Sequence, residues 1–114
     1  MRQWHVDPKL LCRKHLLGEH VESHMFIGSL LKGKSIEGFI RDGLVEVHMI
    51  DVRHEEIAAE MLRRGYNHKS PLPEGTADVL YHAGRVDPKR SIKDLSERCA
   101  ECRERINRAE RIPA

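Results

Sequence analysis

The sequence lacks several features that mark other classes of protein. No apolar run approaches the ~20 residues that a membrane-spanning helix requires, and the first residues do not resemble the apolar stretch of a signal peptide. Internal repeats, linkers and low-complexity segments are missing, and strand-like alternation is nearly absent. At 114 residues the chain can bury one modest core. We therefore expect a compact, all-α single domain over residues 1–114, existing as a monomer with no membrane partner.

Cysteine is also scarce, and its number is odd. Three thiols do not make a disulfide framework, so we expect a reducing, cytoplasmic location. Cys99 and Cys102 form a C-x-x-C pair, but most zinc sites of this kind need a second ligand pair, which favours packing within a helix. His20 and His24 stand four residues apart, a spacing that zinc sites use, yet a satisfied buried pair is the simpler interpretation. A small metal- or redox-responsive protein built on these four residues is one alternative function.

The net charge is only +2, but the charge is unevenly distributed. Residues 1–34 carry six Lys/Arg against three acids, and residues 88–114 carry eight against five. Between them, residues 35–60 carry two against seven. If the two basic ends meet in space, they form a basic face suited to a phosphate backbone. An ordinary mixed surface is the alternative.

The pattern of apolar residues and helix-ending residues predicts a series of helices. Asp7 followed by Pro8 is a typical helix start, and Gly33 and Gly65 are typical residues just past a helix end. The expected helices span residues 8–31, 36–41, 52–64, 77–82 and 88–109. Residues 67–76 form a loop, and residues 44–50 are interpreted as a helix or an extended connector.

The first long helix has two faces of different character. At 100° per residue, we interpret one face as the core stripe, made of Leu17, Val21, His24, Gly28 and Leu31. The opposite face carries His15, Gly18, Glu19, Glu22, Phe26 and Ser29. Two carboxylates and a histidine beside a glycine are poor packing material, so this face is a candidate pocket. A solvated face is the alternative.

The first residue is a candidate nucleophile. Cells trim an initiator Met only before a small residue, and Arg2 is large, so we expect Met1 to be retained. α-Amines titrate near pH ~7.7–8.0, far below lysine at ~10.4. A neutral amine can attack a sugar C1′ or a carbonyl to form a Schiff base, and a nearby carboxylate can move the protons. The alternative is a frayed terminus, as most are.

Two blocks of the sequence together resemble the pyrimidine-dimer DNA glycosylase family. The first block comprises Met1-Arg2, His15-Leu16, Glu19 and Glu22, and the second is the run from Ile57 to Lys69, IAAEMLRRGYNHK. The resemblance implies a compact, all-helical base-excision enzyme. In such an enzyme the α-amine of Met1 would attack C1′ of a damaged nucleotide, assisted by Glu22, and β-elimination would then cleave the strand. It implies no metal and no other cofactor.

The expected partner is double-stranded DNA with a damaged base or an abasic site, so the cytoplasmic protein would act at the nucleoid. The expected DNA contacts are Arg2, Lys14, His15, Glu19, Lys32 and Lys34. Two arginines that the family places around its catalytic glutamate correspond to Val21 and Met25 here, and the aromatic C-terminal tail has no counterpart. Because of these departures, the sequence does not identify which damaged base the protein excises. A non-catalytic DNA-binding helical module is the second alternative function.

Overall fold

The structure is a computed structural model that describes residues 1–110, and these residues form helices and connecting segments without a strand. The all-α expectation is thus confirmed. Among these residues, the helices are too short or too polar to cross a bilayer. In chain order the elements are η1 (Pro8–Leu10), α1 (Arg13–Leu31), α2 (Glu37–Arg41), η2 (Val47–Met49), α3 (Ile50–Arg63), α4 (Thr76–Val79), α5 (Pro88–Arg98) and α6 (Ala100–Glu110).

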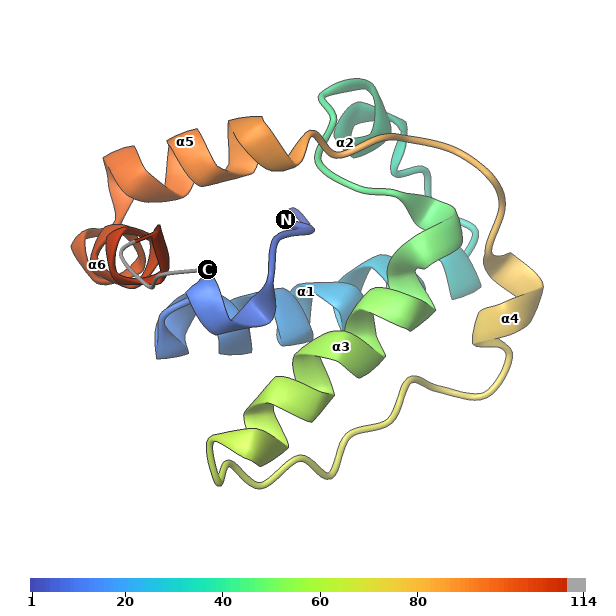
Figure 1. Cartoon of the computed structure of the whole chain (residues 1–114). Coiled ribbons are helices and arrows are strands. Elements are labelled where there is room, and N and C mark those ends of the chain that lie inside the picture. The colour runs from blue at the N-terminus through green and yellow to red at the C-terminus, as the bar shows by residue number, and fades with distance from the viewer. Residues whose placement is uncertain (111–114) are drawn as a thin grey trace.

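The helices are arranged around the N-terminal segment. Helix α1 packs against α3, and α5 packs against α6. Figure 1 shows residues 1–7 entering between α1 and α5, so that the N-terminus lies inside the ring of helices. One core cluster joins this segment to α1, α3, α5 and α6: Trp4, Val6, Leu11, Cys12, Leu16, Ile57, Met61, Leu95, Cys102 and Ile106. The other lies under α2 and the segment before α3: Phe26, Ile27, Ile36, Val45, Val47 and Ile50.

The core stripe predicted for the first long helix is wrong, whereas four residues of the opposite face, His15, Gly18, Glu19 and Glu22, do line a pocket, as expected. Val21 is 54% exposed and Leu31 is 42% exposed, although both were placed on the core stripe. Glu19 and Phe26, placed on the opposite face, are fully buried. Apolar residues occur on every side of α1, so periodicity could not identify the buried side. The packing of α3 against α1 decides it.

Two predicted helices are interrupted. Asp7 caps only the short η1, and α1 begins at Arg13, after Cys12, whose Sγ accepts the N–H of His15 at 3.4 Å. The last helix breaks at Cys99, where φ −135° and ψ 113° separate α5 from α6. The expected helix over residues 77–82 is the single turn α4. The helix predicted over residues 52–64 is observed as α3, beginning two residues earlier.

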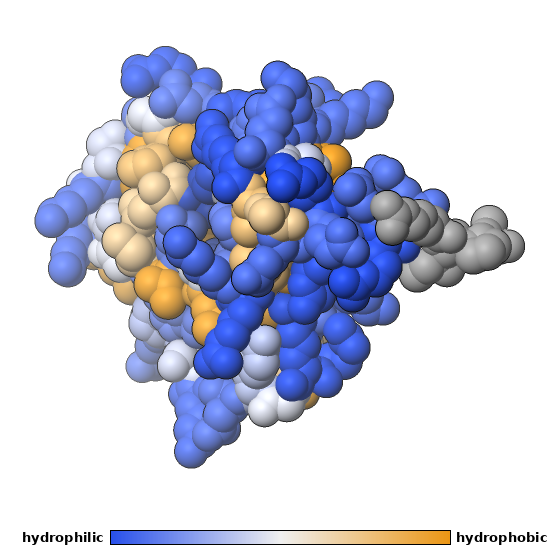
Figure 2. Space-filling view, turned by 90° about the vertical axis from the view of Figure 1, so that its left-hand side faces the viewer, coloured by the Kyte–Doolittle hydropathy of each residue, from blue (hydrophilic) through white to orange (hydrophobic). Residues whose placement is uncertain are grey.

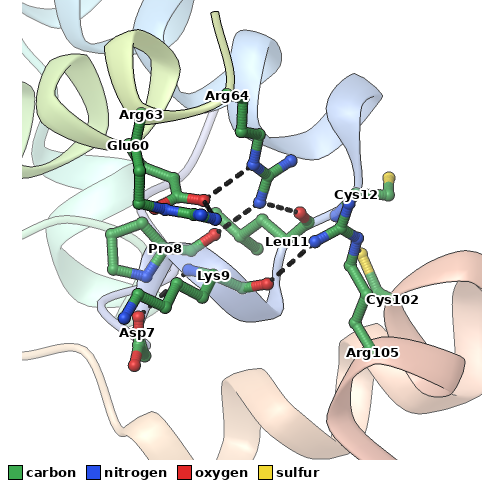
Figure 3. A network of polar contacts seen from close by, with 10 residues as sticks. All are labelled: Asp7, Pro8, Lys9, Leu11, Cys12, Glu60, Arg63, Arg64, Cys102 and Arg105. Atoms are coloured by element: carbon green, nitrogen blue, oxygen red, sulfur yellow. Dashed lines mark hydrogen bonds and ion pairs between the residues drawn. The ribbon is translucent and has the colours of Figure 1, made fainter. Parts of the chain in front are cut away.

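Two arginines hold the η1 turn from opposite sides (Figure 3). Arg64, just past α3, pairs with Glu60 and donates to two backbone carbonyls of the η1 segment at 2.7 and 3.1 Å. Hydrogen bonds from Arg63 and Arg64 lower the pKa of Glu60 to about 2. From the other side, Arg105 of α6 donates to the carbonyl of Lys9 at 3.1 Å. The start of α1 is therefore positioned jointly by α3 and α6.

The side of the molecule that carries α5 and α6 is mostly hydrophilic, with apolar side chains in small patches (Figure 2). The large apolar side chains that are exposed lie on several different elements: Val21, Met25, Leu31, Val52, Leu62 and Tyr81. Such separate exposures are ordinary for a protein surface.

Candidate active site

The N-terminal segment is fixed in place from its first residues. The N–H of Gln3 donates to the carbonyl of Leu44 at 2.7 Å, and its Oε1 accepts the N–H of Glu46 at 3.0 Å. Gln3 is fully buried, and the half-buried Met1 packs against the second core cluster. His5 adopts a left-handed backbone with φ 52°, a conformation that needs support from its surroundings. The segment is therefore ordered and is not a frayed end.

Arg2 and Trp4 anchor the segment to α5. The Arg2 guanidinium lies 3.8 Å from the centroid of the Trp4 ring and pairs with Asp94 at 3.2 Å. Its side chain is only 12% exposed. Trp4 is 6% exposed and belongs to the core, so it is not available to stack on a base. Arg2, expected as a DNA contact, is already paired with Asp94, while its buried Nε has no hydrogen-bond partner within residues 1–110.

An open pocket of about 480 Å³ lies where the N-terminal segment, α1 and α5 meet. Met1 and Glu22 both line it, although they are far apart in the sequence. The other lining residues are Arg2, Trp4, Lys14, His15, Gly18, Glu19, Leu44, Arg90 and Arg98. The volume falls within the range of ≈ 300–1,000 Å³ that small-ligand sites have.

The two glutamates of α1 have different environments. Glu22 is half-buried on the pocket wall, one turn after Gly18. Glu19 is fully buried, and its two oxygens accept bonds from Arg53 at 2.6 and 3.0 Å. Burial raises the pKa of Glu19, and the hydrogen bonds from Arg53 oppose this shift. Because Arg53 also donates to the carbonyl of Val6 at 2.7 Å, the buried ion pair supports both the pocket and the N-terminal segment.

Positive charge around the pocket comes from Arg2 of the N-terminal segment and from two helices. Lys14 of α1 was expected there, but Arg90 and Arg98 of α5 were not identified individually. The only sequence signal for these two arginines was the basic composition of the last segment. Lys32 and Lys34 are exposed beyond the C-terminal end of α1 and do not line the pocket.

The histidines of α1 belong to two separate clusters. His15 lines the pocket and also lies beside three cysteines. His20 is buried and its Nε2 lies 2.9 Å from that of His68, while His24 Nε2 lies 2.9 Å from the Ser70 carbonyl. Burial, followed by the neighbouring imidazoles, lowers the pKa of His20 to about 4. His20 and His24 therefore have partners, as expected for a satisfied pair, and neither lines the pocket.

Two groups of side chains have a geometry that could hold a metal ion. One is the set of His20, His54 and His68, and the other is the set of Cys12, His15, Cys99 and Cys102. In each set the ligand atoms lie within 4.8 Å of one another.

Comparison with known proteins identifies the family. A family model described as pyrimidine dimer DNA glycosylase matches residues 1–74, which is well over half of the chain. The match includes Met1 and Glu22 and ends before α4, so α5 and α6 lie outside it. No curated protein and no solved structure matches the chain. Taken with the all-α fold, the match shows that the chain belongs to the pyrimidine dimer DNA glycosylase family.

Proposed function

We propose that this protein is a DNA N-glycosylase with AP-lyase activity, in which the α-amine of Met1 is the nucleophile and Glu22 moves the protons. The observation that carries the proposal is that Met1, on an ordered N-terminal segment, and Glu22, on α1, line one open pocket. Met1 and Glu22 can supply the amine and the carboxylate, which are the two groups that Schiff-base chemistry at C1′ requires.

The reaction begins with attack of the amine on C1′ of the damaged nucleotide. The bond from C1′ to the base nitrogen breaks, the base leaves with the bonding electrons, and a bond from C1′ to the amine nitrogen forms. The attached nitrogen then loses a proton, O4′ gains one, and the C1′–O4′ bond breaks, which opens the ring and gives an iminium ion. Glu22 removes a proton from C2′, the bond between C3′ and its oxygen breaks, and the 3′ phosphate leaves. Water finally hydrolyses the Schiff base and regenerates the amine.

The charge at the pocket suits a DNA backbone. Lys14 lies on the wall that α1 forms, and Arg90 and Arg98 lie on the wall that α5 forms. Guanidinium groups bind phosphate oxygens in a bidentate manner. We therefore infer that α5 supplies the phosphate contacts near Glu22. The resemblance to the family described above implies that its members make these contacts with two arginines of the helix. Those two positions are Val21 and Met25 in this chain.

Other arginines are less suitable for this task. Arg63 and Arg64 both bond to Glu60, and the side chain of Arg64 is only 8% exposed. Neither lines the pocket. The substrate that fits best is a duplex with a damaged base, since extruding a nucleotide costs least at a damaged or mismatched pair. Pyrimidine dimers are the lesion that the family description names.

Borohydride trapping on an abasic-site duplex tests the proposal directly. Borohydride reduces the iminium ion to a stable amine, so an enzyme of this kind becomes covalently joined to DNA, whereas a non-catalytic DNA-binding module does not. We expect trapping on the abasic duplex and strand cleavage on a duplex that contains a cyclobutane dimer. Binding without trapping on either substrate would contradict the proposal. Trapping on the abasic duplex alone would retain the lyase and reject the dimer as substrate.

Filling the pocket at Gly18 should inhibit the reaction without destabilising the fold. A Cβ added at Gly18 meets no atom within 4 Å, so Gly18→Leu places its side chain in the pocket without a steric clash at Cβ. We expect single-turnover cleavage to fall roughly 10–100-fold because the nucleotide is displaced. Gly18→Ala should raise the free energy of unfolding by about 0.5–1 kcal/mol, as in other helix interiors.

The matched control for this prediction is Gly28→Leu. Gly28 is on the same helix, its added Cβ also meets no atom within 4 Å, and it does not line the pocket. Equal losses of activity in Gly18→Leu and Gly28→Leu would show that the pocket is not where the nucleotide binds.

A further inference from the structure

Three cysteines and a histidine converge on one point beside the start of α1. Cys12 caps α1 and His15 lies in its first turn, and Cys99 and Cys102 come from the junction of α5 with α6. Their ligand atoms all lie within 4.8 Å of one another, and the cysteines are free. Figure 3 shows Cys12 beside the start of α1 and Cys102 on α6. In sequence the two pairs read C-x-x-H and C-x-x-C.

Two distances within the cluster match those of a tetrahedral zinc site, and a third is shorter. Zinc bonds of ≈ 2.3 Å to sulfur and ≈ 2.0–2.1 Å to nitrogen place two sulfurs about 3.8 Å apart and a sulfur and a nitrogen about 3.6 Å apart. The Sγ atoms of Cys12 and Cys99 are 3.8 Å apart, and Cys102 Sγ lies 3.6 Å from His15 Nδ1. Cys12 Sγ lies 3.2 Å from the same nitrogen.

Backbone amides point at all three sulfurs. The N–H of Cys12 donates to Cys102 Sγ at 3.2 Å, that of His15 to Cys12 Sγ at 3.4 Å, and that of Cys102 to Cys99 Sγ at 3.4 Å. Such bonds stabilise negative charge on sulfur and orient the ligands of a metal site. Packing in the core is enough to explain why thiols are buried. It does not explain why the His15 imidazole nitrogen faces the sulfur atoms of both Cys12 and Cys102.

We propose that Cys12, His15, Cys99 and Cys102 form a structural Zn²⁺ site. Four protein ligands leave no open coordination position, which is the pattern of structural and not catalytic zinc. The ion joins α1, within the family-matched residues, to the α5–α6 junction, which lies outside them. His15 is then a zinc ligand, and the break of the last helix at Cys99 is the bend that places both thiolates on the ion. The site adjoins the pocket, because His15 lines both, but the metal analysis below does not depend on the reaction proposed above.

Metal analysis of the purified full-length protein, kept under a non-chelating reductant, tests the proposal. We expect about one zinc per chain, loss of zinc in Cys99→Ser and Cys102→Ser, and retention in His68→Asn, which alters the other metal-like cluster. Chelation should lower the Tm, and added Zn²⁺ should restore it. Absence of zinc, zinc retained in both serine variants, or zinc lost from a folded His68→Asn protein would each overturn the assignment.

Cobalt substitution keeps the test decisive if the serine variants do not fold. Wild-type protein stripped of metal and loaded with Co²⁺ should show thiolate-to-cobalt charge-transfer absorption and the intense visible bands of a tetrahedral site. A cobalt spectrum without thiolate charge transfer would place the metal elsewhere and refute the site.

Discussion

Protein whose N-terminal amine is acetylated is expected to bind abasic-site DNA but to lose borohydride trapping by about 10²-fold or more, because an amide nitrogen is not a nucleophile. A short extension before Met1 should have the same effect, since it moves the free amine out of the pocket. Binding should persist because Lys14, Arg90 and Arg98 are unchanged. The yield of the covalent complex and the identity of the joined peptide are the measurements.

Lys14 provides the control for this prediction, since its ε-amine lines the same pocket. Lys14→Met should weaken binding yet retain trapping once DNA is saturating. If acetylated protein traps at full yield and the joined peptide contains Lys14, then Lys14 is the nucleophile and the role of Met1 is lost.

Glu22→Gln is expected to lower excision and lyase turnover by about 10²-fold or more, because the amide keeps the shape of the side chain but cannot accept the proton. The free energy of unfolding should stay within about 0.5 kcal/mol of wild type, since Glu22 is half-buried and forms no ion pair within residues 1–110. Single-turnover kinetics and denaturant unfolding measure the two quantities.

Glu19→Gln is the contrasting variant, one turn earlier on the same helix. It should cost about 3–5 kcal/mol of stability, because it leaves the buried Arg53 guanidinium with only the half-exposed carboxylate of Glu56 at 3.8 Å. Activity should then be lost together with the fold. A stable but inactive Glu19→Gln protein combined with an active Glu22→Gln protein would reverse the two assignments.

The candidate site was recognised in the sequence only where its members are local or belong to a family motif. Met1, Glu19 and Glu22 were identified from the motif, and Met1 and Glu22 do line one pocket. The helix face predicted to form a pocket does contribute Gly18 and Glu22 to it, but the stripe predicted to be buried opposite that face was wrong, because Val21 and Leu31 are exposed. Arg90 and Arg98 were not identified, since a basic residue on a distant helix carries no local sign of the surface that it faces.

The sequence by itself determined the helical class, the cap at Asp7, and the helix ends at Gly33 and Gly65, because each follows from neighbouring residues. Only the tertiary structure decided which side of α1 is buried, since that depends on where α3 packs.

The tertiary structure also decided which residues lie next to Cys99 and Cys102 of the C-x-x-C pair. In the sequence Cys99 and Cys102 lack a second ligand pair, and nothing local predicts a helix break at Cys99. The missing pair is Cys12 and His15, which the fold brings to the same point. Contacts between residues so distant in the chain form only when the whole core packs, and local patterns therefore could not reveal them.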